Sequence, residues 1–189
     1  MKRTLFSILF LLTCICGFAQ EGLYRFYDYP ISTIDIQTDN DASTQMSVFI
    51  RKIDINSEIK YYCILKATLT DAQRLVRSSH VTMLSYEDLK KINSALALLI
   101  SEEENVWKSG VANIDYAENK YVTENGFKIG FCVNKGRLEW FVETDYFEAV
   151  NGWNVLDRAN EHKAFMFNNG DLLKTCFSQA QEKIESFLE

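Results

Sequence analysis

The chain has 189 residues, with 20 lysines and arginines against 26 aspartates and glutamates, which gives a formal charge of −6. An apolar content of 47%, a single proline and only five cysteines exclude a disordered, collagen-like or disulfide-scaffold protein. The acidic balance and the lack of a basic run exclude a general nucleic-acid binder, because neutralising phosphates takes a basic stripe.

The first 19 residues are predicted to be a secretory signal peptide. Two basic residues precede an apolar run over residues 5–15, and cleavage is expected between Ala19 and Gln20. The apolar run is shorter than the ~20 residues that span a bilayer. Lipidation at Cys14 is a weaker alternative, because the preceding Thr13 suits it badly. We therefore expect a periplasmic or extracellular protein with no transmembrane segment after cleavage.

Residues 20–189 are expected to form a single domain, because no Pro-, Gly- or Ser-rich linker divides them. The N-terminal third alternates between apolar and polar residues, as strands do. We predict two short strands, at residues 23–27 and 31–36, on either side of Pro30. A hairpin formed by residues 46–55 and 59–69 follows them.

Two long amphipathic helices are predicted, at about residues 85–104 and 170–187. Ser85 can cap the first helix, and acids follow it in the first turn. Between the helices, Asn125-Gly126 indicates a hairpin and starts a three-stranded meander over residues 120–144. Strands in two groups without regular strand–helix alternation predict an α+β fold with a mostly antiparallel sheet.

Three cysteines remain after cleavage, namely Cys63, Cys132 and Cys176, and their apolar neighbours predict buried thiols. Whether any two of them pair is left open. A zinc site needs closely spaced cysteines and histidines, which the sequence does not offer. We therefore expect no metal and no other cofactor.

The sequence contains no motif of a known catalytic chemistry, so an enzyme is the less favoured interpretation. Its two histidines, His80 and His162, lie in polar surroundings that are typical of solvated surface residues. The alternative is a hydrolase acting on an envelope polymer or glycan, with carboxylates near residues 145–157. The residues of this candidate groove are Asp145, Tyr146, Trp153, Asp157 and His162.

Aromatic residues make up 13% of the chain, and four of them follow the cleavage site closely. They could form a strip on the edge of a sheet, where an extended segment of another protein could pair. The leading hypothesis is a non-catalytic binding domain of the bacterial envelope that recognises a protein or a glycan. The candidate partner-binding residues are Tyr24, Phe26, Tyr27 and Tyr29.

Three segments carry a resemblance to a known family: residues 84–89, residues 121–130 and residues 167–188. The stretch from Met83 to Leu188 resembles a group of small uncharacterised secreted proteins of Bacteroides-type Gram-negative bacteria. The resemblance covers a little over half of the chain. It implies an envelope location and a domain of sheet plus helices, and it transfers no catalytic residue.

Overall fold

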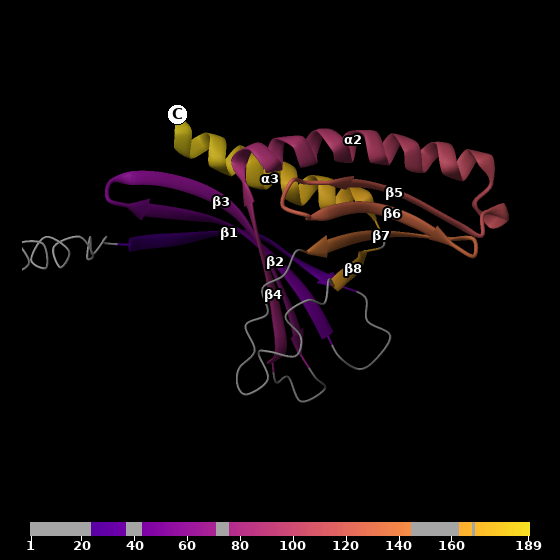
Figure 1. Ribbon diagram of the computed structural model, residues 1–189, viewed down its shortest axis with the longest axis horizontal. Helices are drawn as coiled ribbons and strands as arrows, with labels where there is room; N and C mark the ends of the chain where they lie inside the picture. Colours follow the sequence, from indigo (N-terminus) through magenta and orange to yellow (C-terminus); the bar gives the residue numbers. More distant parts are fainter. Residues whose placement is uncertain (1–23, 37–42, 71–75, 145–162, 168) are drawn as a thin grey trace, which may run out of the picture.

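The computed structural model describes residues 24–36, 43–70, 76–144, 163–167 and 169–189. They form two four-stranded antiparallel sheets and two long helices, which confirms the predicted α+β class. Sheet A contains β1 to β4 and sheet B contains β5 to β8, each in chain order (Figure 1). The bounds are β1 Tyr24–Ile36, β2 Ser43–Ile55, β3 Glu58–Thr70, β4 Val76–Ser85, α2 Tyr86–Ser109, η1 Val111–Asn113, β5 Tyr116–Val122, β6 Lys128–Asn134, β7 Arg137–Thr144, β8 Lys163–Phe167 and α3 Gly170–Leu188.

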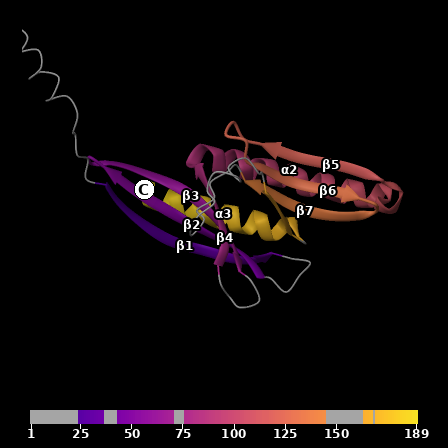
Figure 2. The ribbon, with the colours of Figure 1, turned by 60° about the horizontal axis from the view of Figure 1, so that its bottom comes forward.

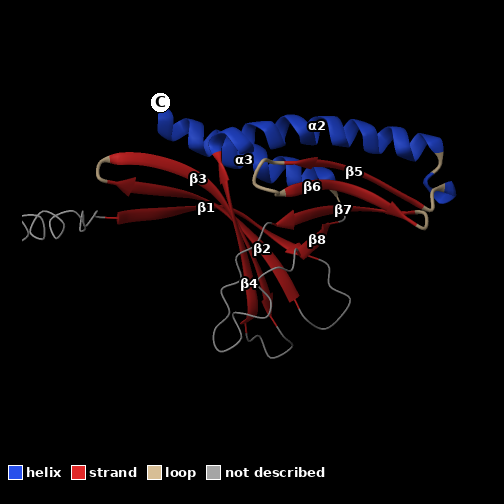
Figure 3. Ribbon diagram, viewed as in Figure 1, coloured by secondary structure: helices blue, strands red, loops and turns tan. Residues whose placement is uncertain are grey.

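The order of elements repeats, because each group of four strands is followed by one long helix. Each helix nevertheless packs on strands from the other half of the chain. The C-terminal helix α3 packs on β1, β2 and β3 of sheet A, whereas α2 packs on β5 and β6 of sheet B as well as on β3 and β4. Figure 3 shows both helices on the same side of the strands. The two halves of the chain therefore share one packed structure, because the helix of each half contacts strands of the other.

One hydrophobic core lies between the helices and the inner faces of both sheets. Fully burying a large apolar side chain of this kind stabilises a protein by roughly 1.5–3 kcal/mol. The largest fully buried side chains come from both sheets and both helices: Trp140, Phe127, Phe131, Phe177, Met46, Ile50, Leu65, Leu84, Leu89, Ile92 and Leu96.

Polar contacts join the two helices, which run in opposite directions. The hydroxyl of Tyr86 donates a hydrogen bond to Glu185 Oε1 at 3.0 Å. The amide of Asn93 donates to Gln181 Oε1 at 2.7 Å and to the Phe177 carbonyl at 3.1 Å. The position of α3 over sheet A is thus fixed partly by α2.

The first helix begins where the sequence predicts and ends later. Ser85 and Asp88 form a capping box, in which the Asp88 amide donates to Ser85 Oγ at 3.1 Å. The helix was expected to end at residues 102–104, and this prediction is wrong because it continues to Ser109. Gly110, at φ 93°, supplies the left-handed residue that ends it.

Other boundaries also differ from the sequence predictions. The two short strands expected around Pro30 are one strand, β1, with a register shift between Pro30 and Ser32. Proline is tolerated there because β1 lies at the edge of sheet A. The strands β4 and β8 were not predicted, since each follows a polar stretch of sequence.

The turn between β2 and β3 leads to a prediction of higher stability. Asn56 and Ser57 both have positive φ, 52° and 71°, as in a type I′ turn. A left-handed conformation is costly for serine and not for glycine. Ser57→Gly should therefore raise the free energy of unfolding by roughly 0.5–1 kcal/mol, as measured by urea denaturation. Asn56→Gly, the matched control, should gain less because asparagine tolerates this region. A loss of stability in Ser57→Gly would contradict the argument.

Candidate partner-binding surface

The outer face of sheet A, opposite the helices, carries hydrophobic side chains that lie outside the core. Strand register places the residues of this face in successive rows across the sheet. One row contains Phe49, Ile64 and Met83, the next contains Asp28, Arg51 and Tyr62, and a third contains Phe26 with Ile53. We call the following residues the outer patch: Phe26, Phe49, Arg51, Tyr62, Ile64 and Met83.

The outer patch presents apolar surface to solvent in spite of its buried centre. Ile64 is only 1% exposed and lies between Phe49 and Met83 in the register. By contrast, Phe26 is 63% exposed and Met83 is 51% exposed. Large, exposed hydrophobic side chains around a buried centre are typical of protein interaction sites.

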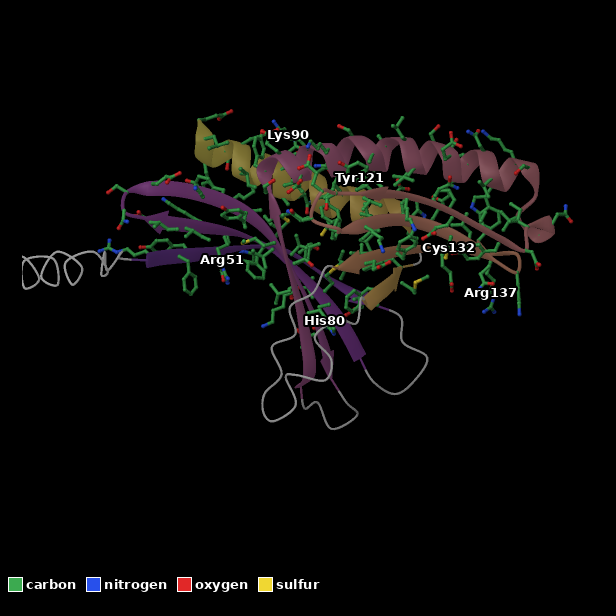
Figure 4. All side chains as sticks on the ribbon, viewed as in Figure 1. Arg51, His80, Lys90, Tyr121, Cys132 and Arg137 are labelled. Atoms are coloured by element: carbon green, nitrogen blue, oxygen red, sulfur yellow. The ribbon has the colours of Figure 1, made fainter. Side chains whose placement is uncertain are left out.

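Arg51 fixes the geometry of the patch near the edge of the sheet (Figure 4). Its Nε and one terminal nitrogen each donate to a carboxylate oxygen of Asp28 at 2.7 Å. Its guanidinium carbon lies 4.8 Å from the ring centroid of Phe26 and 5.5 Å from that of Phe49. The hydrogen bond to Asp28 raises the pKa of Arg51 above its ordinary value. Arg51 is therefore a permanently charged group held by Asp28 over the rings of Phe26 and Phe49.

The four aromatic residues predicted to bind a partner all lie on β1, but they do not share one surface. Phe26 belongs to the outer patch. Tyr29 points to the inner face, where its ring lies 4.7 Å from that of Phe187 in α3. Tyr27 is 51% exposed and shares the parity of Tyr29. The Tyr24 backbone pairs with Ile55, and its side chain lies outside the described atoms.

Sequence reasoning missed most of the outer patch, although a signal was present. In β2, the residues Phe49 and Ile53 alternate with Val48 and Ile50, so both faces of the strand carry apolar side chains. Such a strand is expected to have both faces covered. Among the described residues, the helices cover only the inner face.

The residues of the alternative hydrolase groove cannot be placed. Asp145, Tyr146, Trp153, Asp157 and His162 all lie outside the described residues. The other histidine departs from expectation, since His80 is 5% exposed and its ring lies 5.6 Å from that of Phe165 in β8. The prediction of a solvated surface residue at His80 is therefore wrong, because β4 turns it toward sheet B.

The three cysteines described by the structure are free thiols. Cys63 and Cys176 are buried, as predicted, and Cys132 is half-buried on the outer face of sheet B (Figure 4). Burial raises the pKa of Cys63 and of Cys176, and burial with Glu139 and Glu118 nearby raises that of Cys132. All three thiols are thus poor nucleophiles at neutral pH.

Within the described ranges, no cluster of His, Cys, Asp and Glu side chains could hold a metal ion. Nor is any described helix both long and apolar enough to cross a membrane. No protein-family model matches the sequence, and a search of curated proteins finds no relative. The resemblance to secreted Bacteroides-type proteins therefore stays a prediction.

Proposed function

We propose that this protein is an exported, non-catalytic binding domain of the bacterial envelope, and that the outer patch on sheet A holds its protein partner. The observation that carries the proposal is that the exposed Phe26 ring lies over Arg51, and that Phe26 and the exposed Met83 share a face of sheet A that the described helices leave uncovered. The predicted signal peptide supports the location.

The composition of the outer patch supports a protein partner. Aromatic residues, methionine and arginine are the types enriched at protein interfaces. Arg51 adds a positive charge, although its ion pair with Asp28 reduces the electrostatic attraction that it can offer to a partner. The apolar rings therefore supply most of the binding energy, and Arg51 holds the Phe26 ring in place.

The free edge of β1 adjoins the patch and offers a second means of recognition. In sheet A, β1 pairs with β2 on one side, and no described strand lies on its other side. Unpaired backbone groups of an edge strand can bind an extended segment of another protein. The segment would lie alongside Phe26, so the two features form a continuous surface.

The experiment is capture of envelope proteins by the tagged chain 20–189 in its native host, with brief crosslinking and mass spectrometry. Phe26→Ser and Met83→Ser should each weaken the binding of the captured partner at least tenfold, because each removes exposed apolar contact area. Both side chains are exposed, so the melting temperature should change little.

Trp107→Ser is the matched control. Trp107 is 57% exposed on α2, away from the strands that carry the patch. A partner that tolerates both patch variants, or that is lost equally with Trp107→Ser, would refute the assignment of the outer patch.

A further inference from the structure

Among the described strands, β5 is the edge of sheet B opposite β8, and its sequence is self-complementary. It pairs with β6 on one side, and Figure 2 shows it as the outermost strand of its sheet. Its side chains alternate between exposed and half-buried. The even-numbered residues form the exposed set: Tyr116, Glu118, Lys120 and Val122. Tyr116 and Val122 are among the large hydrophobic residues that are most exposed, at 65% and 46%.

The backbone amides and carbonyls that are unpaired at the edge of β5 belong to the even-numbered residues as well. The amide of Thr123 donates to the carbonyl of Phe127 at 2.9 Å, so Thr123 turns its backbone toward β6. Backbone direction alternates along an antiparallel strand. The even-numbered residues of β5 therefore point their amides and carbonyls away from sheet B, toward any strand that joins it.

Symmetry restricts how two copies of β5 could pair. In an antiparallel pair within one sheet, opposite residues face the same side. A twofold axis perpendicular to the sheet must therefore pass through a residue rather than between two residues. The centre of β5 is Asn119, and an axis there places Glu118 opposite Lys120 of the second copy. The same register places Tyr116 opposite Val122.

We propose that β5 pairs with β5 of a second copy of this chain, antiparallel and centred on Asn119, so that the two sheets B join into one continuous sheet. Each outward-facing residue of β5 then meets a complementary residue, charge with opposite charge and apolar with apolar. Glu118 and Lys120 already form a 2.9 Å ion pair within one chain. In the dimer, the two Glu118–Lys120 pairs lie next to each other, so each Glu118 has a Lys120 beside it in its own strand and another opposite it in the second copy.

The position of α2 supports this pairing. Because α2 packs on β5 and β6, the α2 helices of the two copies would lie side by side on one face of the joined sheet. Strands are about 4.8 Å apart, and each α2 lies about one strand spacing from the twofold axis. The axes of the two α2 helices would therefore be about 10 Å apart, a normal distance for packed helices. Leu98 is 70% exposed, and it lies on the side of α2 that carries the Lys91–Glu124 ion pair at the β5–β6 hairpin.

The edge strand of sheet A lacks the same complementarity. Along β1, Asp28 and Asp35 face outward with Phe26, whereas Arg25 has the opposite parity. No symmetric register can therefore set Arg25 against Asp28. The second copy thus belongs on β5, and β1 stays available for the partner of the outer patch.

A charge-exchange series tests the proposal on the chain 20–189, with sedimentation velocity measured over a wide range of concentrations. The unmodified chain should dimerise. Glu118→Lys and Lys120→Glu should each weaken the dimer at least tenfold, because each sets like charges opposite one another twice. The double variant E118K/K120E should dimerise like the unmodified chain, and an equal mixture of the two single variants should form a mixed dimer.

A disulfide test fixes the register. Opposite residues at a non-hydrogen-bonded position have Cα atoms about 4.5 Å apart, within the range that a disulfide bridges. Asn119→Cys, in a chain that carries Cys132→Ser, should form a crosslinked dimer with oxidised glutathione. Ala117→Cys is the matched control on the same face, since its two copies would be about 13 Å apart and should stay uncrosslinked.

Circular dichroism and thermal melting establish that each variant is folded. A chain that remains monomeric at every concentration overturns the proposal, as does a dimer that tolerates both single charge variants. Crosslinking at Ala117→Cys but not at Asn119→Cys overturns the register. None of these outcomes bears on the outer patch, which lies on the other sheet.

Discussion

Replacing Gly130 by alanine should destabilise the protein by about 3 kcal/mol, the upper end of the usual cost of overpacking. A Cβ atom at this position would overlap the carbonyl oxygen of Asn119 and would lie 2.7 Å from Lys120 Cα. Both are backbone atoms of β5, so no rotation of a side chain can relieve the contact. The strand β5 would have to move away from β6, which breaks the hydrogen bonds between them.

Urea denaturation measures the loss, and amide hydrogen exchange locates it. Exchange should accelerate along β5 before the rest of the sheet, because the ladder between β5 and β6 is broken first. Cys132→Ala is the matched control, since Cys132 lies on the same face of β6 and is half-buried. A Gly130→Ala protein within 1 kcal/mol of the unmodified chain would show that β5 can shift at little cost.

Gly170→Ala should cost roughly 2–3 kcal/mol, although alanine is normally preferred to glycine in a helix by about 1 kcal/mol. Gly170 is the first residue of α3, and a Cβ there would meet the six-membered ring of Trp140, with Cη2 at 2.8 Å. Trp140 is fully buried and its ring centroid lies 5.4 Å from that of Phe131. The indole therefore has little room to move aside.

A second substitution separates this clash from an effect on the helix. Trp140→Phe removes the ring atoms that meet the added Cβ, so the double variant should lose less stability than the sum of the two single ones. It also removes the indole Nε1, which is buried and makes no hydrogen bond to the described residues. Additive losses would show that Gly170 is needed for a different reason.

Local signals in the sequence predicted much of the fold. The cap at Ser85, the turn at Asn56-Ser57 and the apolar spacing of the C-terminal helix depend on residues close together in the chain, and the structure confirms these elements. The end of α2 was misjudged because three acids at residues 102–104 suggested termination. Gly110 was the stronger signal, since it supplies the left-handed conformation directly.

Features that depend on contacts between residues far apart in the chain could not be predicted from the sequence. The sequence shows Gly130 as one more glycine near a hairpin, whereas its role comes from the passage of β5 beside it. His80 reads as a surface residue until β8 is placed next to it. The outer patch combines residues from four strands, and only Phe26 was a candidate from the sequence. Strand alternation then separates Phe26 from Tyr27 and Tyr29, which the sequence had grouped together.

The packing of α3 on the first strands of the chain has a consequence for the order in which the core can form. Sheet A is built from the first strands that the structure describes, but the inner faces of β1, β2 and β3 pack on α3, the 19-residue helix Gly170–Leu188. During synthesis, β1 and β2 cannot bury their inner apolar side chains against α3 until this helix has been made. The chain thus lacks a complete core until α3 has formed.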